Sequence, residues 1–352
     1  MSLFEKILHD DESFIKDFEV LEFSYMPKNL LYREKEQNEI AYAIKPLFNK
    51  TNGSNILIHG VQGIGKTIAC KRVLEELEDY DEVESIYINC WQYNTEFKIF
   101  SYINDQLGNI TSSNKVEDLQ KKAISSLNKS SVVIILDEFD KLENFDIIYT
   151  FLEQLYRKSI LLITNFKDIV NKIDPRITSR LNLKELEFRP YNEFEVKGIL
   201  LERIKFAFYR PNAFDKDSFD KVVATTLESK DMRKGLVLIR ECALQAENDA
   251  KRKIDIDVVN NVIKTMLNRA NPSINKSDEL SLDQQLLLDV VKEQSQKIKI
   301  GYLFELYQNK GGAKSYKSVQ RAIDRLYKGK FIDIEKSITA EGNTTFIQLK
   351  KL

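Results

Sequence analysis

The chain has 352 residues, 43% of them hydrophobic and 30% charged, which is enough for two or three domains with buried cores. A formal net charge of −1 excludes a surface that is basic throughout, so any contact with nucleic acid must be local. Three scattered cysteines and two histidines argue against a zinc site or a disulfide framework, and favour a reducing compartment.

The chain begins with residues 1–24, which mix charged residues with scattered Phe and Leu. We expect an N-terminal arm there, with a short helix or partial order. An extended segment at 26–34 follows, and apolar residues at helical spacing predict a helix at 35–48.

Residues 55–59 form an apolar strand that runs into Gly60-x4-Gly65-Lys66-Thr67, and a helix follows to about residue 78. This spacing is that of a phosphate-binding loop. Glycines let backbone N–H groups surround the β-phosphate, Lys66 reaches the β- and γ-oxygens, and the Thr67 hydroxyl binds Mg²⁺. A chance glycine turn is the alternative, but the strand before it and the helix after it favour a site for ATP or ADP with Mg²⁺.

A second apolar run ends in two carboxylates, Asp137 and Glu138. The first carboxylate would bind Mg²⁺, and the second would polarise the water that attacks the γ-phosphate. Acidic residues also end strands without any such role. Strands are expected at 85–90, 131–138, 160–165 and 184–188. A helix is expected at 91–108, and residues 121–128 are expected to close another helix.

Three more polar side chains follow in the same part of the chain. Asn165 ends a buried strand, where it would orient the lytic water or sense the γ-phosphate, or simply begin a turn. Arg176 and Arg180 follow a helix, and either one would act in trans as an arginine finger on a neighbouring subunit's nucleotide, or lie solvated at the surface.

Beyond residue 190 the strand pattern stops, and helices are expected at 193–207, 214–226 and 232–247. Strands that alternate with helices, followed by helices alone, predict an α/β fold: a doubly wound parallel sheet at 25–190 with an all-helical lid at 191–270. Arg233 begins a lid helix, from which its side chain would reach the γ-phosphate.

Residues 271–280 are polar, contain a proline and lack periodicity, which predicts a linker. The last part, 281–352, has 13 Lys and Arg against 8 Asp and Glu, a net charge of +5. Its helix at 315–328 carries an apolar seam, Val319, Ile323 and Leu326, opposite a basic stripe. Strands at 331–334 and 345–349, with a turn at 341–343, complete a winged helix. The basic residues expected to contact DNA are Lys314, Lys317, Arg321, Arg325 and Lys328, although solvated helices also carry such residues.

Together these pieces resemble the origin-recognition and Cdc-type replication initiator ATPases of the AAA+ class, in the compact archaeal form. The resemblance runs from Pro27 to Leu349. Besides the phosphate-binding loop, it depends on Pro27, Leu30-x2-Arg33-Glu34, Tyr87-Ile88-Asn89-Cys90, the stretch from Leu136 to Leu142, Asp174-Pro175-Arg176, and the stretch from Phe188 to Tyr191 with Ile199, Leu200 and Arg203.

The resemblance implies a role for each matching position. Nucleotide contacts fall on Gly63, Ile64, Gly65, Lys66 and Thr67, with Tyr191 and Arg203 on the lid side; Thr67 and Asp137 bind the metal; Glu138, Asn165 and Arg233 are the water-activating acid and the two sensors. Residues 26–34 would lie over the adenine, unless they are an ordinary surface connection. The helix at 95–106 matches an insertion that reaches the DNA backbone in this family.

The expected function is therefore that of an ATP-dependent replication initiator and weak ATPase. Its partners would be double-stranded origin DNA, a replicative helicase of the MCM type, and further copies of itself or paralogous initiators. The alternative is a signalling or transposition-type ATPase whose winged helix binds protein. No apolar run has the length of a membrane span, so we expect no membrane partner and a cytoplasmic, nucleoid-associated protein.

Overall fold

The computed structural model describes residues 13–110, 115–270, 282–294, 297–312, 314–328, 331–339 and 342–349. The chain forms two compact units, Met1–Val259 and Asn260–Leu352, each with its own hydrophobic core. The expected linker at 271–280 lies outside the described residues.

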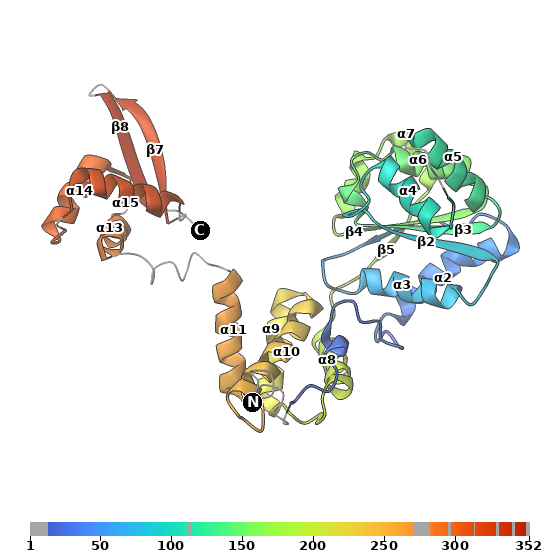
Figure 1. The fold of residues 1–352 in the computed structure, drawn as a ribbon, viewed down its shortest axis with the longest axis horizontal. Coiled ribbons are helices and arrows are strands. Elements are labelled where there is room, and N and C mark those ends of the chain that lie inside the picture. Colours follow the sequence, from blue (N-terminus) through green and yellow to red (C-terminus); the bar gives the residue numbers. More distant parts are fainter. Residues whose placement is uncertain are drawn as a thin grey trace. The chain divides into compact units, whose positions relative to one another are not determined.

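The first unit is built on a parallel sheet of five strands in the order β2-β3-β4-β1-β5 (Figure 1). In chain order they are β1 (Ile56–His59), β2 (Val83–Asn89), β3 (Ser131–Asp137), β4 (Lys158–Thr164) and β5 (Lys184–Glu187). Strand β1 pairs with β4 and β5, and the helical connections that follow the neighbouring strands β1 and β4 lie on opposite faces of the sheet. Ligands of such sheets bind outside the carboxyl ends of the strands, at this kind of switch point.

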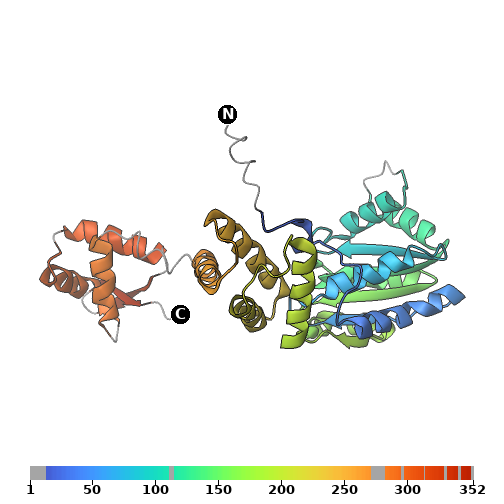
Figure 2. The ribbon, with the colours of Figure 1, turned by 90° about the horizontal axis from the view of Figure 1, so that it is seen from below.

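Helices cover both faces of the sheet, as Figures 1 and 2 show. One face carries α2 (Glu34–Ile44) and α3 (Lys66–Leu77), and the other carries α4 (Glu96–Gln106), α5 (Val116–Leu127), α6 (Asp146–Gln154) and α7 (Pro175–Leu181). Short 3₁₀ helices lie at η2 (Lys45–Asn49), η3 (Phe139–Lys141) and η4 (Lys167–Lys172). Every residue of β3 is buried, because both of its faces are covered.

Several helix boundaries differ from those expected. The helix expected at 91–108 begins only at Glu96, because the Thr95 side chain accepts a hydrogen bond from the Lys98 backbone N–H and caps it there. The helix expected at 35–48 ends at Ile44 and continues as η2, where Pro46 lacks the N–H that an α-helix needs. Residues 121–128, which were expected to close a helix, are the second half of α5, which begins at Val116 and has its C-cap at Asn128.

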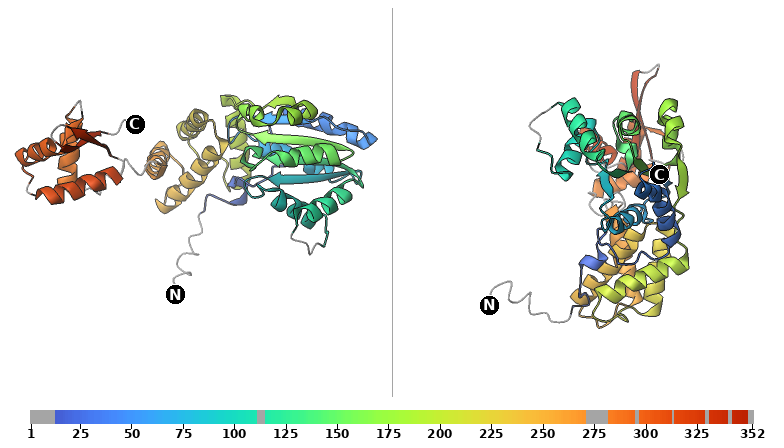
Figure 3. Two further views of the ribbon diagram at one scale, coloured as in Figure 1. Left: turned by 90° about the horizontal axis from the view of Figure 1, so that it is seen from above. Right: turned by 90° about the vertical axis from the view of Figure 1, so that its right-hand side faces the viewer.

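The lid consists of α8 (Glu193–Ala207), α9 (Lys216–Ser229), α10 (Met232–Asn248) and the start of α11 (Ile256–Ala270). Asn192 and Glu195 form a capping box that fixes where α8 begins after the last strand. The described part of the N-terminal arm runs along the lid (Figure 3), since the backbone N–H groups of Lys16 and Asp17 both donate to the Ala207 carbonyl. The arm also includes η1 (Glu19–Leu21).

The second unit is a small helical domain with an antiparallel sheet in the order β6-β8-β7. Its elements are α13 (Leu282–Lys292), β6 (Ile298–Lys299), α14 (Ile300–Asn309), α15 (Tyr316–Lys328), β7 (Ile332–Thr339) and β8 (Gly342–Leu349). This is a winged helix, so the predicted fold class is confirmed. The expected turn at 341–343 is wrong in part: Thr339 pairs with Gly342, so Gly342 and Asn343 belong to β8. Within the described residues, no helix is both long and apolar enough to cross a membrane.

Candidate functional site

The phosphate-binding loop joins the buried strand β1 to α3. Gly63 and Gly65 have φ values of 76° and 93°, in the left-handed region that side chains with a Cβ disfavour. A Cβ at Gly60 would lie 2.3 Å from the carbonyl oxygen of Phe188, and one at Gly65 would lie 3.0 Å from the Tyr191 hydroxyl. The glycines are therefore required both by the turn and by the chain that passes close to it.

Lys66 lies inside the loop, with 7% of its surface exposed. Its Nζ donates to the carbonyl oxygens of Gly60 and Val61, at 2.8 and 2.9 Å, and to Oδ1 of Asn165, at 2.8 Å. Burial lowers the pKa of Lys66 to about 8, against the attraction of Asp137 and other acids. The hydrogen bond between Lys66 and Asn165, which are both predicted site residues, joins the loop to the end of β4.

Asp137, at the end of β3, accepts two hydrogen bonds on the same oxygen, Oδ2. Thr67 donates from Oγ1 at 2.7 Å, and Tyr87 donates from its phenol at 2.6 Å. Burial and the nearby carboxylate raise the pKa of Tyr87, so its hydroxyl stays a donor. Both hydrogen bonds are made to Oδ2, and none to Oδ1 is found within the described part of the chain. A hydroxyl beside a carboxylate is the donor set that Mg²⁺ takes beside substrate phosphates, so these residues fit that ion.

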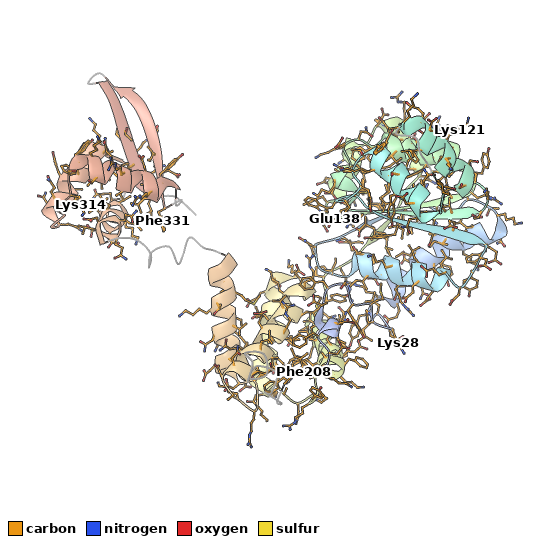
Figure 4. The ribbon with its side chains drawn as sticks, viewed as in Figure 1. Lys28, Lys121, Glu138, Phe208, Lys314 and Phe331 are labelled. Carbon is orange, nitrogen blue, oxygen red and sulfur yellow. The ribbon has the colours of Figure 1, made fainter. Side chains whose placement is uncertain are left out.

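Glu138, labelled in Figure 4, follows Asp137 at this edge of the sheet. Its backbone is left-handed, with φ of 53°, which is uncommon for a residue other than glycine and is often found at functional sites. Its Oε2 is buried and has no hydrogen-bond partner in the described part of the chain. Burial, and then the charges of Asp137 and Asp140, raise the pKa of Glu138. A carboxyl group held in this way is suited to accept a proton.

The lid touches the loop through the first residues of α10. The Met232 backbone N–H donates to the Gly63 carbonyl at 3.1 Å, and a Cβ at Gly63 would lie 1.8 Å from Oδ1 of Asp231. The Asp231 carboxylate also pairs with the Arg233 guanidinium through two hydrogen bonds of 2.8 and 3.0 Å. Arg233 is thus held beside the loop by a partner that sequence reasoning missed.

Arg33 is a second missed residue, although it belongs to a stretch on which the resemblance depends. It is fully buried, and its Nη2 donates to the carbonyl oxygens of Ile64 and Arg189, while its Nη1 pairs with Glu36. Its guanidinium lies 4.0 Å from the ring centroid of Tyr191. Arg33 therefore joins the phosphate-binding loop to the hinge between sheet and lid.

These residues surround one cavity of about 280 Å³. The predicted site residues that line it are Gly63, Gly65, Lys66, Thr67, Asp137, Glu138, Asn165, Tyr191, Arg203 and Arg233. Its apolar part includes Leu30, Leu31 and Ile199, so the segment expected over the adenine does reach the cavity. The Arg203 guanidinium also donates to the Val20 carbonyl of the arm and lies over the ring of Tyr25, which follows the arm. The buried Ile64 side chain is not part of the lining.

The two finger candidates lie outside this cavity. Arg176 is largely exposed and pairs with Asp174. Arg180 pairs with Glu153, and its guanidinium lies 5.5 Å from the ring centroid of Tyr149. Neither arginine lines the nucleotide cavity of its own chain.

The basic residues of the second unit lie on the exposed side of α15. Val319, Ile323 and Leu326 are buried in the domain core, as expected for the seam. On the opposite side of the helix, the exposed basic residues are Lys317, Arg321 and Arg325. Lys314 is exposed just before the helix begins. Lys328 ends the helix, and its side chain lies outside the described part.

Comparisons with known proteins bear on both units. A family model described as an AAA domain matches residues 49–170. The chain is 30% identical over 299 residues to an ORC1-type DNA replication protein of Thermococcus kodakarensis, covering 75% of this chain and 72% of that protein. It is 31% identical over 298 residues to an ORC1-type DNA replication protein of Pyrococcus furiosus, covering 75% and 70%. The fold is similar to that of the Aeropyrum pernix ORC1 protein solved in complex with DNA, with a TM-score of 0.66 and 24% identity over 96% of this chain and 94% of that one.

Proposed function

The chain belongs to the ORC1-type DNA replication proteins, and on that premise we propose that it is an initiator that binds double-stranded origin DNA and helps to recruit or load a replicative helicase of the MCM type. ATP binding and slow hydrolysis would serve as a switch. The observation that carries this proposal is the convergence of Lys66, Asp137 and Glu138 on the cavity of the first unit.

Each residue of the cavity has a distinct task in this proposal. Lys66 would exchange its loop carbonyls for the β- and γ-phosphate oxygens, and Thr67 with Asp137 would hold Mg²⁺. A bound Mg²⁺ supplies positive charge that stabilises the leaving and transferred phosphate oxygens. Glu138 would take the proton of the attacking water, and Asn165 would orient that water.

Binding to duplex DNA is the part of the proposal that separates it from the rival function, a protein-binding winged helix. Fluorescence anisotropy on a candidate origin duplex and a scrambled one, at several salt concentrations and with ATP or ADP, tests it. We expect affinity to fall steeply with salt, because each neutralised phosphate contributes a slope of about −0.9 in log K against log salt. An absence of duplex binding at every salt concentration would favour the protein-binding rival.

The surface arginines are candidates for action in trans, on the nucleotide of a neighbouring copy or paralogue. We expect Arg176→Ala or Arg180→Ala subunits to bind ATP normally when alone. When Glu138→Gln is added to silence the variant's own site, the subunit that lacks the finger would fail to stimulate hydrolysis by a wild-type partner. Glu138→Gln alone would still stimulate it, since arginine fingers contribute about 10³-fold or more to turnover. Normal stimulation by both variants under assembling conditions would exclude the trans role.

A further inference from the structure

Tyr87 places its phenol on the carboxylate at the end of the neighbouring strand. In the parallel pairing of β2 with β3, Asn89 lies opposite Asp137, and Tyr87 is two residues earlier on the same face of the sheet. It is therefore the diagonal neighbour of Asp137 in the sheet. Only a long side chain spans the distance between such neighbours. The hydrogen bond of 2.6 Å to Oδ2 is the result.

The Tyr87 ring is held in place independently of this hydrogen bond. It packs on the core between α3 and the sheet. The Lys71 ammonium lies 4.5 Å from its centroid. Lys71 follows Thr67 by one helical turn on α3, so the ring touches the same helix that supplies the other donor to Asp137. Packing of the ring thus directs the phenol at Asp137, independently of the hydrogen bond between them.

From this arrangement we propose that Tyr87 is a positioning residue of the nucleotide–metal site. With Thr67, it holds the Asp137 carboxylate through Oδ2, in an orientation from which that carboxylate would bind the cation. This inference rests on the proposed nucleotide site and adds to it a residue from β2.

Two donors on one carboxylate oxygen restrict rotation of the carboxylate more than one donor does. A carboxylate already oriented before the cation arrives loses less conformational freedom on binding it. The loss of the phenol would therefore weaken the use of Mg²⁺ while leaving the protein's contacts with the nucleotide in place.

The test is Tyr87→Phe, which removes the hydroxyl and keeps the ring. A fluorescent ATP analogue is titrated into the full chain at fixed Mg²⁺ concentrations, from chelator alone to several millimolar. We expect the Mg²⁺ concentration that half-restores tight binding to rise about tenfold, the factor that the loss of one hydrogen bond to a charged group gives. Binding in chelator is expected to match the wild type.

Two variants separate the hydroxyl from the ring. Lys71→Met removes the charge over the ring and leaves the hydroxyl, so its Mg²⁺ midpoint is expected to stay near that of the wild type. Tyr102→Phe removes a phenol from the opposite face of the sheet, where Tyr102 stacks on Tyr93, and controls for the loss of any phenol.

Three outcomes would overturn the inference. The first is an unchanged Mg²⁺ midpoint in Tyr87→Phe. The second is an equal shift in Tyr102→Phe. The third is a fall in melting temperature together with weaker binding in chelator, which would assign Tyr87 a structural role. A wild-type chain that binds no nucleotide at any Mg²⁺ concentration would instead overturn the proposed function.

Discussion

The nucleotide cavity and the basic side of α15 are built in opposite ways. Residues of the cavity come from five or more separate segments and are largely buried. They also share partners: Lys66 donates to Asn165, and Asp137 accepts hydrogen bonds from both Thr67 and Tyr87. The basic residues of α15 follow one another on a single exposed helix face. Substitutions in the cavity should therefore interact with one another, whereas those on α15 should add.

The largest expected effect is that of Glu138→Gln, which tests whether one residue of the cavity acts in chemistry alone. We expect ATP binding to be retained and hydrolysis to fall about 10²- to 10⁴-fold, the range for loss of a general base. Phosphate release and nucleotide titration measure the two quantities. Glu143→Gln, an exposed carboxylate five residues later, is the control. Turnover at the wild-type rate in Glu138→Gln would mean that another group activates the water.

Lys66→Ala is expected to weaken ATP binding about 100-fold, because it removes the hydrogen bonds from a buried cation to the phosphates. Isothermal titration measures this loss. Arg72→Ala, on the same helix and paired with the surface carboxylates of Glu75 and Glu76, is the control and should bind like the wild type. Wild-type affinity in Lys66→Ala would remove the loop from the nucleotide site.

The double variant of Arg321→Ala with Arg325→Ala tests the basic side of α15 in the second unit. We expect duplex affinity to fall about tenfold or more, the effect of losing base-reading contacts, with melting temperature and ATP binding nearly unchanged. Lys292→Ala with Lys297→Ala removes the same charge elsewhere in the unit and is the matched control. Equal losses in both double variants would show that charge alone, and not the helix face, governs binding.

Lys317→Ala has the smallest expected effect and tests for a contact with the DNA backbone. We expect affinity to decrease evenly on origin and scrambled duplexes, and the salt slope to flatten by about 0.9 for the lost phosphate contact. Anisotropy at several salt concentrations gives both numbers. A loss confined to the origin duplex would instead assign Lys317 to base reading.

Sequence patterns predicted the fold because they act over short distances. The phosphate-binding loop, the buried run before Asp137 and the seam of α15 each lie within about a dozen consecutive residues. The prediction of the hairpin turn was less accurate, because Gly342 and Asn343 are typical turn residues yet pair within β8. The turn-forming tendency of a residue pair does not reveal the register of its strands.

Partners that depend on tertiary contacts could not be predicted in this way. The phenol of Tyr87 meets Asp137 only through the pairing register of β2 with β3, and Asp231 meets Gly63 only because the lid folds back onto the loop. Arg33 was visible as part of a motif, but nothing near it in sequence indicated complete burial. The roles assigned to the predicted site residues stay predictions until the variants are measured.

The burial of Arg33 has a consequence for how the first unit unfolds. Its guanidinium bonds to the loop at Ile64 and to the hinge at Arg189, and lies over the ring of Tyr191. If the hinge moved away from the loop, the guanidinium would keep Ile64 and Glu36 but lose the Arg189 carbonyl and the ring of Tyr191. The loss of a hydrogen bond to a charged group costs about 1.5–3 kcal/mol. Sheet and lid should therefore melt in a single cooperative transition, and amides in α8 should exchange with solvent no faster than those of β1.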